Sequence, residues 1–171
     1  MDGRYRGWRP THERRAVGQQ KAIVMSTMQF EVDLEWRSDQ RAGEITAGEA
    51  RTPVSGPRVL GGTGAGMSPE DLFVAAAASS FGAMLAEMLR AAELPQTILA
   101  IHAEGLVAGD PGALRFTSVT VRPTIHGADA AQRQAYEKAA IAARNYCFIG
   151  RSIRGNIAYL VGKVGLVESV E

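Results

Sequence analysis

The sequence has very little cysteine and histidine. Among its 171 residues, Cys147 is the only cysteine, and there are only three histidines, which are widely spaced. A single thiol cannot form an intrachain disulfide, and it excludes a cysteine-rich zinc site. Three scattered histidines also argue against a histidine-based metal site. We therefore expect no metal and no other cofactor.

An excess of one charge and a long apolar run are also lacking. Nineteen Lys and Arg against eighteen Asp and Glu give a net charge of +1, which argues against a dedicated nucleic-acid binder. No run approaches the roughly 18 consecutive apolar residues of a membrane helix. The N-terminal residues lack the apolar stretch of a secretory signal. We expect a cytoplasmic protein with no nucleic-acid and no membrane partner.

The composition is that of a single soluble domain, with 46% hydrophobic residues. Its charge is unevenly distributed. Residues 1–27 hold six basic and two acidic side chains, a net of +4, whereas residues 28–171 hold thirteen and sixteen, a net of −3. We predict a flexible basic extension over residues 1–27 and one folded domain over residues 28–171.

The periodicity of apolar residues predicts an α+β fold. Phe30, Val32, Leu34 and Trp36 alternate with polar residues, as in a half-buried strand. The later segments give the order ββ-α-ββ-α-β, with two helices against antiparallel sheet. We expect strands at 30–36, 43–50, 98–107, 114–125 and 157–167, helices at 69–92 and 129–144, a Gly- and Pro-rich loop at 52–67, and a short helical turn at 146–155.

The first predicted helix has a well-defined start. Ser68 can cap the free backbone N–H groups, Pro69 suits the first helical position, and Glu70 and Asp71 favour the positive end of the helix dipole. The run Ala75–Ala78 is small on nearly every side. Such a helix allows close approach of another helix, so we expect it to be central.

Two other features have structural explanations. The loop Gly62-Thr63-Gly64-Ala65-Gly66 lacks the Lys-Ser/Thr pair of a P-loop and does not have the GxGxxG spacing. We interpret it as a flexible loop that leads into the helix. His102 and His126 lie in or at the end of predicted strands without a nearby nucleophile, and we interpret them as surface residues.

Cys147 allows two interpretations. A single Cys in an apolar stretch is more often a small core residue than a nucleophile. However, Arg144, Arg151 and Arg154 lie within seven positions of Cys147, and a nearby arginine favours the reactive thiolate.

Two motifs resemble those of the OsmC/Ohr family, the osmotically inducible and organic hydroperoxide resistance proteins. Ser68-Pro69-Glu70-Asp71-Leu72-Phe73 is similar to the family's Asn-Pro-Glu-x-Leu helix start. The segment from Cys147 through Arg151 to Gly155-Asn156 is similar to its Cys-Pro-x-Ser-Lys-x-Leu-x-Gly-Asn motif. With the order of elements, the resemblance covers about residues 28–168.

The resemblance implies an OsmC-like fold in an intertwined homodimer, with two long central helices between sheets and active sites at the subunit interface. It also implies a thiol peroxidase. A first cysteine attacks an organic hydroperoxide, its sulfenic acid condenses with a second cysteine, and a dithiol reductant restores both. A Glu and an Arg hold the first thiolate.

This sequence departs from the family at the first cysteine. The position ten residues after Glu70 is Ser80, and Cys147 matches the second, resolving cysteine. A serine hydroxyl has no sulfur that can form a sulfenic acid. Glu70 matches the family's Glu. Its Arg corresponds to Arg58 in one branch of the family and to Arg37 in the other, and Arg41 is a weaker third choice.

Three functions follow from these residues. The first is an OsmC-like protein without dithiol peroxidase activity that binds a small apolar ligand at the interface pocket. The alternative is a one-cysteine hydroperoxide reductase in which Cys147 attacks and an external thiol resolves it. The weakest is acyl transfer by Ser80, which lacks a base because no motif places His102 or His126 beside it.

Overall fold

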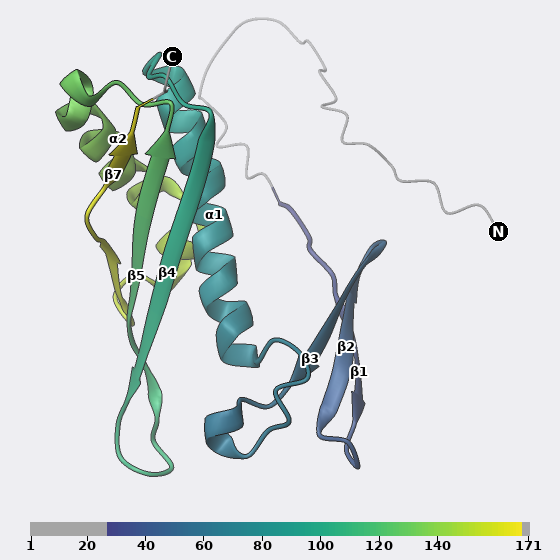
Figure 1. Ribbon diagram of the computed structural model, residues 1–171. Coiled ribbons are helices and arrows are strands. Elements are labelled where there is room, and N and C mark those ends of the chain that lie inside the picture. The colour runs from purple at the N-terminus through teal and green to yellow at the C-terminus, as the bar shows by residue number, and fades with distance from the viewer. Residues whose placement is uncertain (1–26, 169–171) are drawn as a thin grey trace, which may run out of the picture. The chain divides into compact units, whose positions relative to one another are not determined.

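The computed structural model describes residues 27–168 (Figure 1). Val32–Glu171 forms one compact unit, and Met1–Glu31 is a separate one. The extension predicted for residues 1–27 lies, apart from Thr27, outside the described residues.

The first sheet is an antiparallel meander of three strands. It consists of β1 (Asp33–Arg37), β2 (Ala42–Ala47) and β3 (Ala50–Ser55) in that order. We predicted two strands followed by a loop from residue 52, so β3 corrects that prediction. The turn between β2 and β3 contains Gly48 at φ 61, a conformation that suits glycine. Pro53 is accommodated because β3 is an edge strand, where a missing N–H is tolerated.

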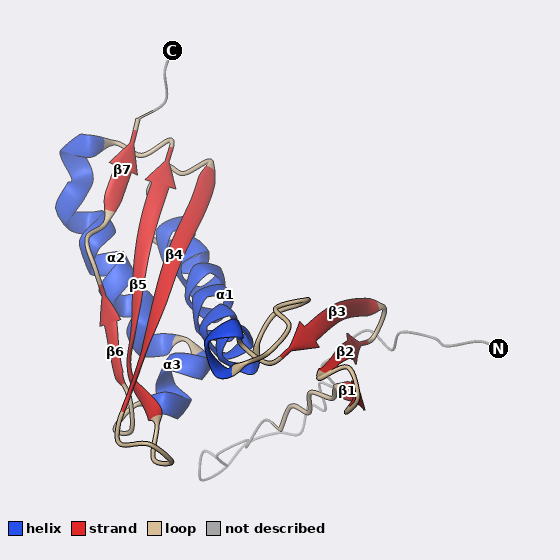
Figure 2. Cartoon of the chain, turned by 60° about the horizontal axis from the view of Figure 1, so that its bottom comes forward, coloured by secondary structure: helices blue, strands red, loops and turns tan. Residues whose placement is uncertain are grey.

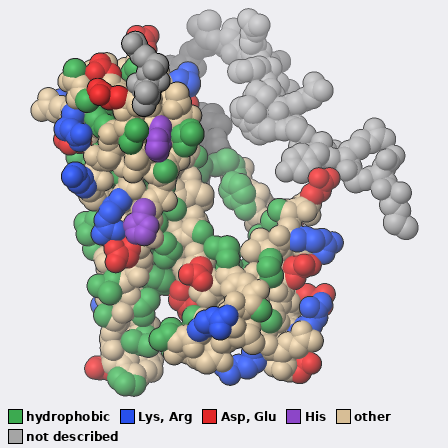
Figure 3. Space-filling model, viewed as in Figure 1, with side chains coloured by type: hydrophobic (Ala, Val, Ile, Leu, Met, Phe, Trp, Pro, Cys, Tyr) green, Lys and Arg blue, Asp and Glu red, His purple; other side chains and the backbone are tan. Residues whose placement is uncertain are grey.

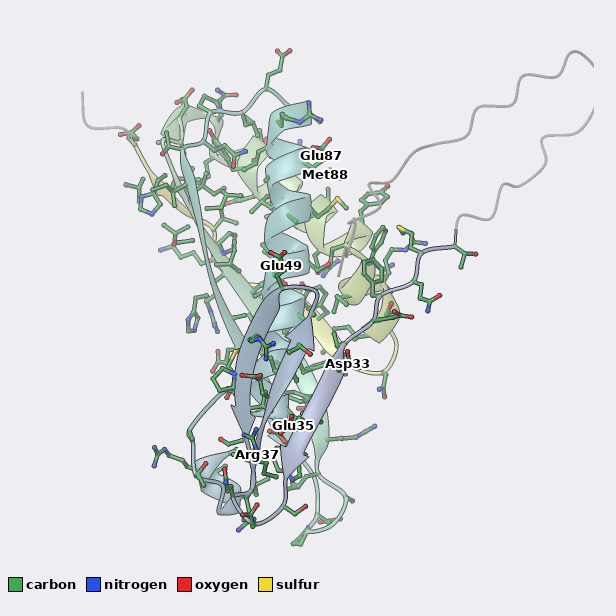
Figure 4. All side chains as sticks on the ribbon, turned by 90° about the vertical axis from the view of Figure 1, so that its right-hand side faces the viewer. Asp33, Glu35, Arg37, Glu49, Glu87 and Met88 are labelled. Atoms are coloured by element: carbon green, nitrogen blue, oxygen red, sulfur yellow. The ribbon has the colours of Figure 1, made fainter. Side chains whose placement is uncertain are left out.

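One face of β1 is apolar and uncovered. Leu34 is 57% exposed and Trp36 43% exposed, whereas Asp33, Glu35 and Arg37 alternate with them along the strand (Figure 4). The prediction of a half-buried strand is therefore wrong within a single chain. The alternation is present, but no described element of the same chain covers the apolar face.

Helix α1 (Pro69–Ala91) begins and ends close to the predicted residues. The Asp71 N–H donates to Ser68 Oγ at 3.1 Å, and the Ser68 N–H donates to Asp71 Oδ2 at 2.9 Å, which forms a capping box. Hydrogen bonds from the Ser68 backbone and then from its hydroxyl lower the pKa of Asp71. The cap fixes the residue at which the helix starts and so the position of Glu70 in its first turn.

Helix α1 forms the centre of the core. Ala77, Phe81, Leu85 and Leu89 are fully buried, and their spacing of four places them on one face. By length and composition alone α1 would suffice to cross a membrane, a test that core helices of soluble proteins also pass. Its buried face packs against the second sheet and against α2 (Arg133–Tyr146) and α3 (Phe148–Ile153).

The second sheet mixes antiparallel and parallel pairs. Strands β4 (Ile98–Ala108) and β5 (Arg115–His126) form the predicted antiparallel hairpin. Strands β6 (Ala158–Val161) and β7 (Gly165–Val167) both run parallel to β5. We predicted one antiparallel strand over 157–167, so both its continuity and its direction are corrected. The chain crosses over through α2 and α3 before it returns to the sheet, and such a crossover produces parallel pairing.

The helices cover one face of this sheet, which gives a two-layer arrangement (Figure 2). Val119, Val121 and Ile125 of β5 are fully buried in the core shared with α1. The other face is exposed and carries both apolar and charged side chains, among them a 2.8 Å ion pair between Arg122 of β5 and Glu104 of β4. Charged side chains and histidines are visible there in Figure 3. These observations confirm the α+β class and the central role of α1.

Candidate active site

Two cavities meet at the start of α1. The larger has a volume of about 720 Å³ and the other about 490 Å³. Glu70, Asp71, Val107 and Phe116 line both cavities. The first turn of α1 therefore borders an apolar space formed with the β4–β5 hairpin, at the end of α1 where the sequence placed the family's Glu.

Glu70 has an unmatched polar atom. Its Oε2 is buried and has no hydrogen-bond partner among the described residues. A buried acceptor without a partner is costly, by about 1–3 kcal/mol or more for a charged group. The position favours a hydrogen-bond donor or a cation beside Glu70, from the protein or from a ligand.

Arg58 is the predicted arginine that shares a cavity with Glu70. It lies in the short 3₁₀ helix Arg58–Leu60 and lines the larger cavity. Its side chain lies over Gly64, which has φ +65 and leaves no room for a Cβ beneath the Arg58 guanidinium. Arg37 is instead exposed on β1 and donates to Glu35 Oε1 at 2.7 Å. Within one chain, the geometry therefore joins Arg58, and not Arg37, to the Glu70 cavity.

Ser80 lies near the middle of α1 and is half-buried. It follows Ala77 by one turn, so the two residues share a face of the helix. The lining of the Glu70 cavities ends on α1 at Ala78. Ser80 is thus beyond this lining, two residues further along α1.

Cys147 is joined to α1 through Tyr159. The thiol is 1% exposed, and its Sγ lies 4.0 Å from Tyr159 Oη and 3.7 Å from the Arg144 carbonyl oxygen. Tyr159 Oη in turn donates to the Ala77 carbonyl oxygen at 3.1 Å. The tyrosine hydroxyl therefore lies between the only thiol and the helix that carries Ser80.

Burial favours the protonated form of this hydroxyl. Burial raises the pKa of Tyr159 well above its usual value, Cys147 raises it further, and Arg144 partly opposes the shift. A protonated hydroxyl can donate to the Ala77 carbonyl, as observed. One of the two interpretations of Cys147 relied on the nearby arginines, but Arg144 and Arg154 direct their guanidinium groups to Asn145.

Gly150 explains one departure from the family motif. It stands where the motif has Ser, and it is buried in α3. A Cβ at this position would overlap the Tyr159 ring and would lie 2.7 Å from Cys147 Sγ. The Tyr159 ring therefore occupies the space that a side chain at residue 150 would need.

We expect Gly150→Ser to destabilise the protein by about 1–3 kcal/mol, because overpacking a filled core costs this much. Serine gains at most about 0.5 kcal/mol over glycine in helix propensity, so overpacking dominates. Urea unfolding measures the change. In a Tyr159→Ala background the same substitution should cost much less, and equal costs in both backgrounds would disprove the overlap.

The histidines do not supply a base for Ser80. His102 is exposed on β4 between Ile101 and Ala103, which pack against the core. Since side chains alternate along a strand, His102 faces away from α1. His126 follows buried Ile125 in the same way. This geometry argues against acyl transfer, and the described residues contain no cluster of metal-ligating side chains.

Tyr159 was missed in the sequence, although Cys147, Ser80 and Glu70 were identified. It lies twelve residues after Cys147, within a segment that reads only as a strand. The glycine at position 150 was a usable signal, since a small residue there implies a bulky neighbour.

Together these features define a class of protein, a two-layer α+β domain built on a long capped helix with a carboxylate at its start. The family model described as OsmC-like protein matches residues 62–159, which include α1, Ser80 and Cys147. The chain belongs to the OsmC-like family.

Three known proteins are similar to this chain. YmaD of Bacillus subtilis, an uncharacterized protein, is 27% identical over 137 residues, which cover 78% of this chain and 91% of the relative. An organic hydroperoxide resistance protein OsmC from Legionella pneumophila has a similar fold, with a TM-score of 0.67, 20% identity, and coverage of 82% and 98% of the two chains. A Vibrio cholerae protein, a candidate for organic hydroperoxide resistance, has a TM-score of 0.67, 23% identity, and coverage of 82% and 94%; it was solved with captopril in one active site.

Proposed function

We propose that this protein is an OsmC-like homodimer that binds a small apolar compound and lacks the dithiol peroxidase activity of its relatives. The observation that carries the proposal is Ser80, which occupies the position of the attacking cysteine. An alcohol cannot take up the peroxide oxygen as a sulfenic acid. With Cys147 as the only thiol, the disulfide step of the family is also excluded.

The alternative, a one-cysteine reductase, has less support. An attacking thiol must meet the hydroperoxide, and reactive cysteines are partly exposed. Cys147 is 1% exposed and is part of the hydrophobic core. Its Sγ faces Tyr159 and a backbone carbonyl instead of either cavity beside Glu70.

A binding role is supported by the larger Glu70 cavity. Its volume of about 720 Å³ is within the range of small-molecule sites. Apolar walls of Val107, Leu114 and Phe116 face the polar groups of Arg58 and Glu70. The captopril in the Vibrio cholerae relative shows that an active site of that protein admits a small organic molecule.

A homodimer is supported by apolar surface that one chain leaves uncovered. Leu34 and Trp36 of β1 remain exposed although their spacing is that of a buried strand face. Tyr146 and Phe148, on either side of Cys147, are each 59% exposed. A second copy that covers these residues would give β1 the buried face that its sequence predicts.

The test is consumption of cumene hydroperoxide with dithiothreitol as reductant. We expect no consumption beyond that of the dithiol alone, because no accessible thiol is present. Rapid turnover would overturn the proposal. If that turnover were lost in Cys147→Ser, the one-cysteine reductase would be the correct function.

A further inference from the structure

A third cavity lies next to the residues that surround Cys147 and is separate from the two cavities at Glu70. It has a volume of about 360 Å³ and is lined by Arg144, Asn145, Gly150, Arg154, Ile157 and Tyr159. The end of α2, the helix α3 and the start of β6 build it. None of its lining residues is shared with the two cavities at Glu70.

Two guanidinium groups converge in this cavity on one neutral oxygen. Arg144 Nη2 donates to Asn145 Oδ1 at 2.9 Å, and Arg154 Nη2 donates to the same oxygen at 3.3 Å. Arg154 Nη2 also donates to the Asn145 carbonyl oxygen at 3.2 Å. Each guanidinium has five N–H donors, so most donors of the pair remain available.

Within residues 27–168, no acidic side chain forms an ion pair with either arginine. Residues 139–162 contain three arginines and no Asp or Glu. Among the described residues, the salt bridges join other arginines and include neither Arg144 nor Arg154. Two cations held side by side repel each other, and an anion between them would remove that repulsion.

We propose that Arg144 and Arg154 form a binding site for a small oxyanion that carries a compact apolar group. The planar guanidinium fork matches the two oxygens of a carboxylate or phosphate. Ile157 and the ring of Tyr159 supply the apolar wall, and the cavity volume is at the small end of ligand sites. The Glu70 cavities have no excess of positive charge: Glu70 and Asp71 match the two arginines of the larger cavity, and no Lys or Arg lines the smaller one.

The anion would bind close to the buried thiol. Tyr159 lines the cavity and contacts Cys147 Sγ through its hydroxyl. The site is nevertheless independent of Ser80 and of the proposed lack of peroxidase activity, since none of its residues lies on α1.

The test is calorimetric titration with inorganic phosphate and with phenyl phosphate, at constant ionic strength in a chloride buffer. We expect saturable binding, with phenyl phosphate tighter because its ring meets Ile157 and Tyr159. Arg154→Gln should weaken both by about tenfold or more, the effect of a lost charge-assisted hydrogen-bonded contact. Arg154→Lys, which keeps the charge but loses the fork, should also weaken binding.

The matched control is Arg151→Gln. Arg151 is exposed on α3, three residues before Arg154, and lines a different cavity with Phe148 and Ser152. Arg151→Gln removes the same charge as Arg154→Gln, but at a residue that does not line the proposed site. Salt screens such a charge, so the affinity for phosphate should change by less than about twofold. If Arg151→Gln and Arg154→Gln weakened phosphate binding equally, the loss would come from the lower net charge and not from a specific site, and the proposal would be overturned. Absence of saturable binding, or phenyl phosphate no tighter than phosphate, would overturn it as well.

Discussion

The Ser80→Cys protein is expected to consume cumene hydroperoxide at least about a hundredfold faster than the natural chain, which corresponds to about 3 kcal/mol of activation free energy. The substitution adds a sulfur nucleophile at the half-buried position that matches the family's first cysteine. Glu70 matches the family's Glu and shares a cavity with Arg58, which fits the Arg of one branch of the family. On α1 the lining of the two Glu70 cavities ends at Ala78, two residues before position 80. The measurement is hydroperoxide loss with dithiothreitol under identical conditions.

In this reaction the thiolate attacks the terminal peroxide oxygen. An S–O bond forms, the O–O bond breaks, and cumyl alcohol leaves with a proton from solvent. The sulfenic acid is then reduced by two electrons from the dithiol, with release of water. Cys147 can take part only if its Sγ leaves Tyr159 Oη, 4.0 Å away, so the external dithiol is the expected reductant.

Ser79→Cys is the control for this variant. Ser79 is exposed on the same helix, and its Oγ donates to the Ala76 carbonyl oxygen. A cysteine there adds the same thiol on a different face of α1 and should leave the rate near that of the natural chain. Equal activation by both variants, or by neither, would contradict the assignment of position 80.

Phe81→Ala is expected to lower the free energy of unfolding by about 3–5 kcal/mol, the usual cost of truncating a fully buried phenylalanine. Phe81 has no exposed surface and lies near the centre of α1. A loss of this size is a large share of the roughly 5–15 kcal/mol that stabilises a typical domain. Urea unfolding followed by circular dichroism gives the value.

Phe148→Ala provides the comparison, since Phe148 is 59% exposed at the start of α3. In a monomer, Phe148→Ala should change the free energy of unfolding by no more than about 0.5 kcal/mol. Protein concentration must be fixed, because a midpoint that rises with concentration indicates a folded dimer. If the two substitutions had similar effects at low protein concentration, α1 would not be the centre of the core.

Local signals predicted the parts of the fold that depend on neighbouring residues. The start of α1 follows from Ser68 and Pro69, whose capping roles need only the next few residues. The β4–β5 hairpin follows from alternation on both sides of a Gly-Pro turn. Glu70 and Ser80 were located because they lie at fixed distances from this helix start.

Features that depend on distant residues were missed. Strand β3 was not predicted because it contains Pro53, and proline lowers strand propensity. An edge strand nevertheless tolerates a proline. The parallel direction of β6 depends on the crossover through α2 and α3, which periodicity does not report. The contact of Tyr159 with Ala77 joins residues 82 positions apart. The alternation in β1 predicted that its apolar side chains share one face of the strand, but it did not predict what covers that face.

The interlock of Gly150 and Tyr159 also constrains how this motif changes over generations. A side chain at position 150 and the present tyrosine ring compete for the same space. The cost of a serine at position 150 therefore depends on which residue stands at position 159. A change at one of these positions is best tolerated when it is accompanied by a change at the other, so the two residues vary as a unit and not as independent sites.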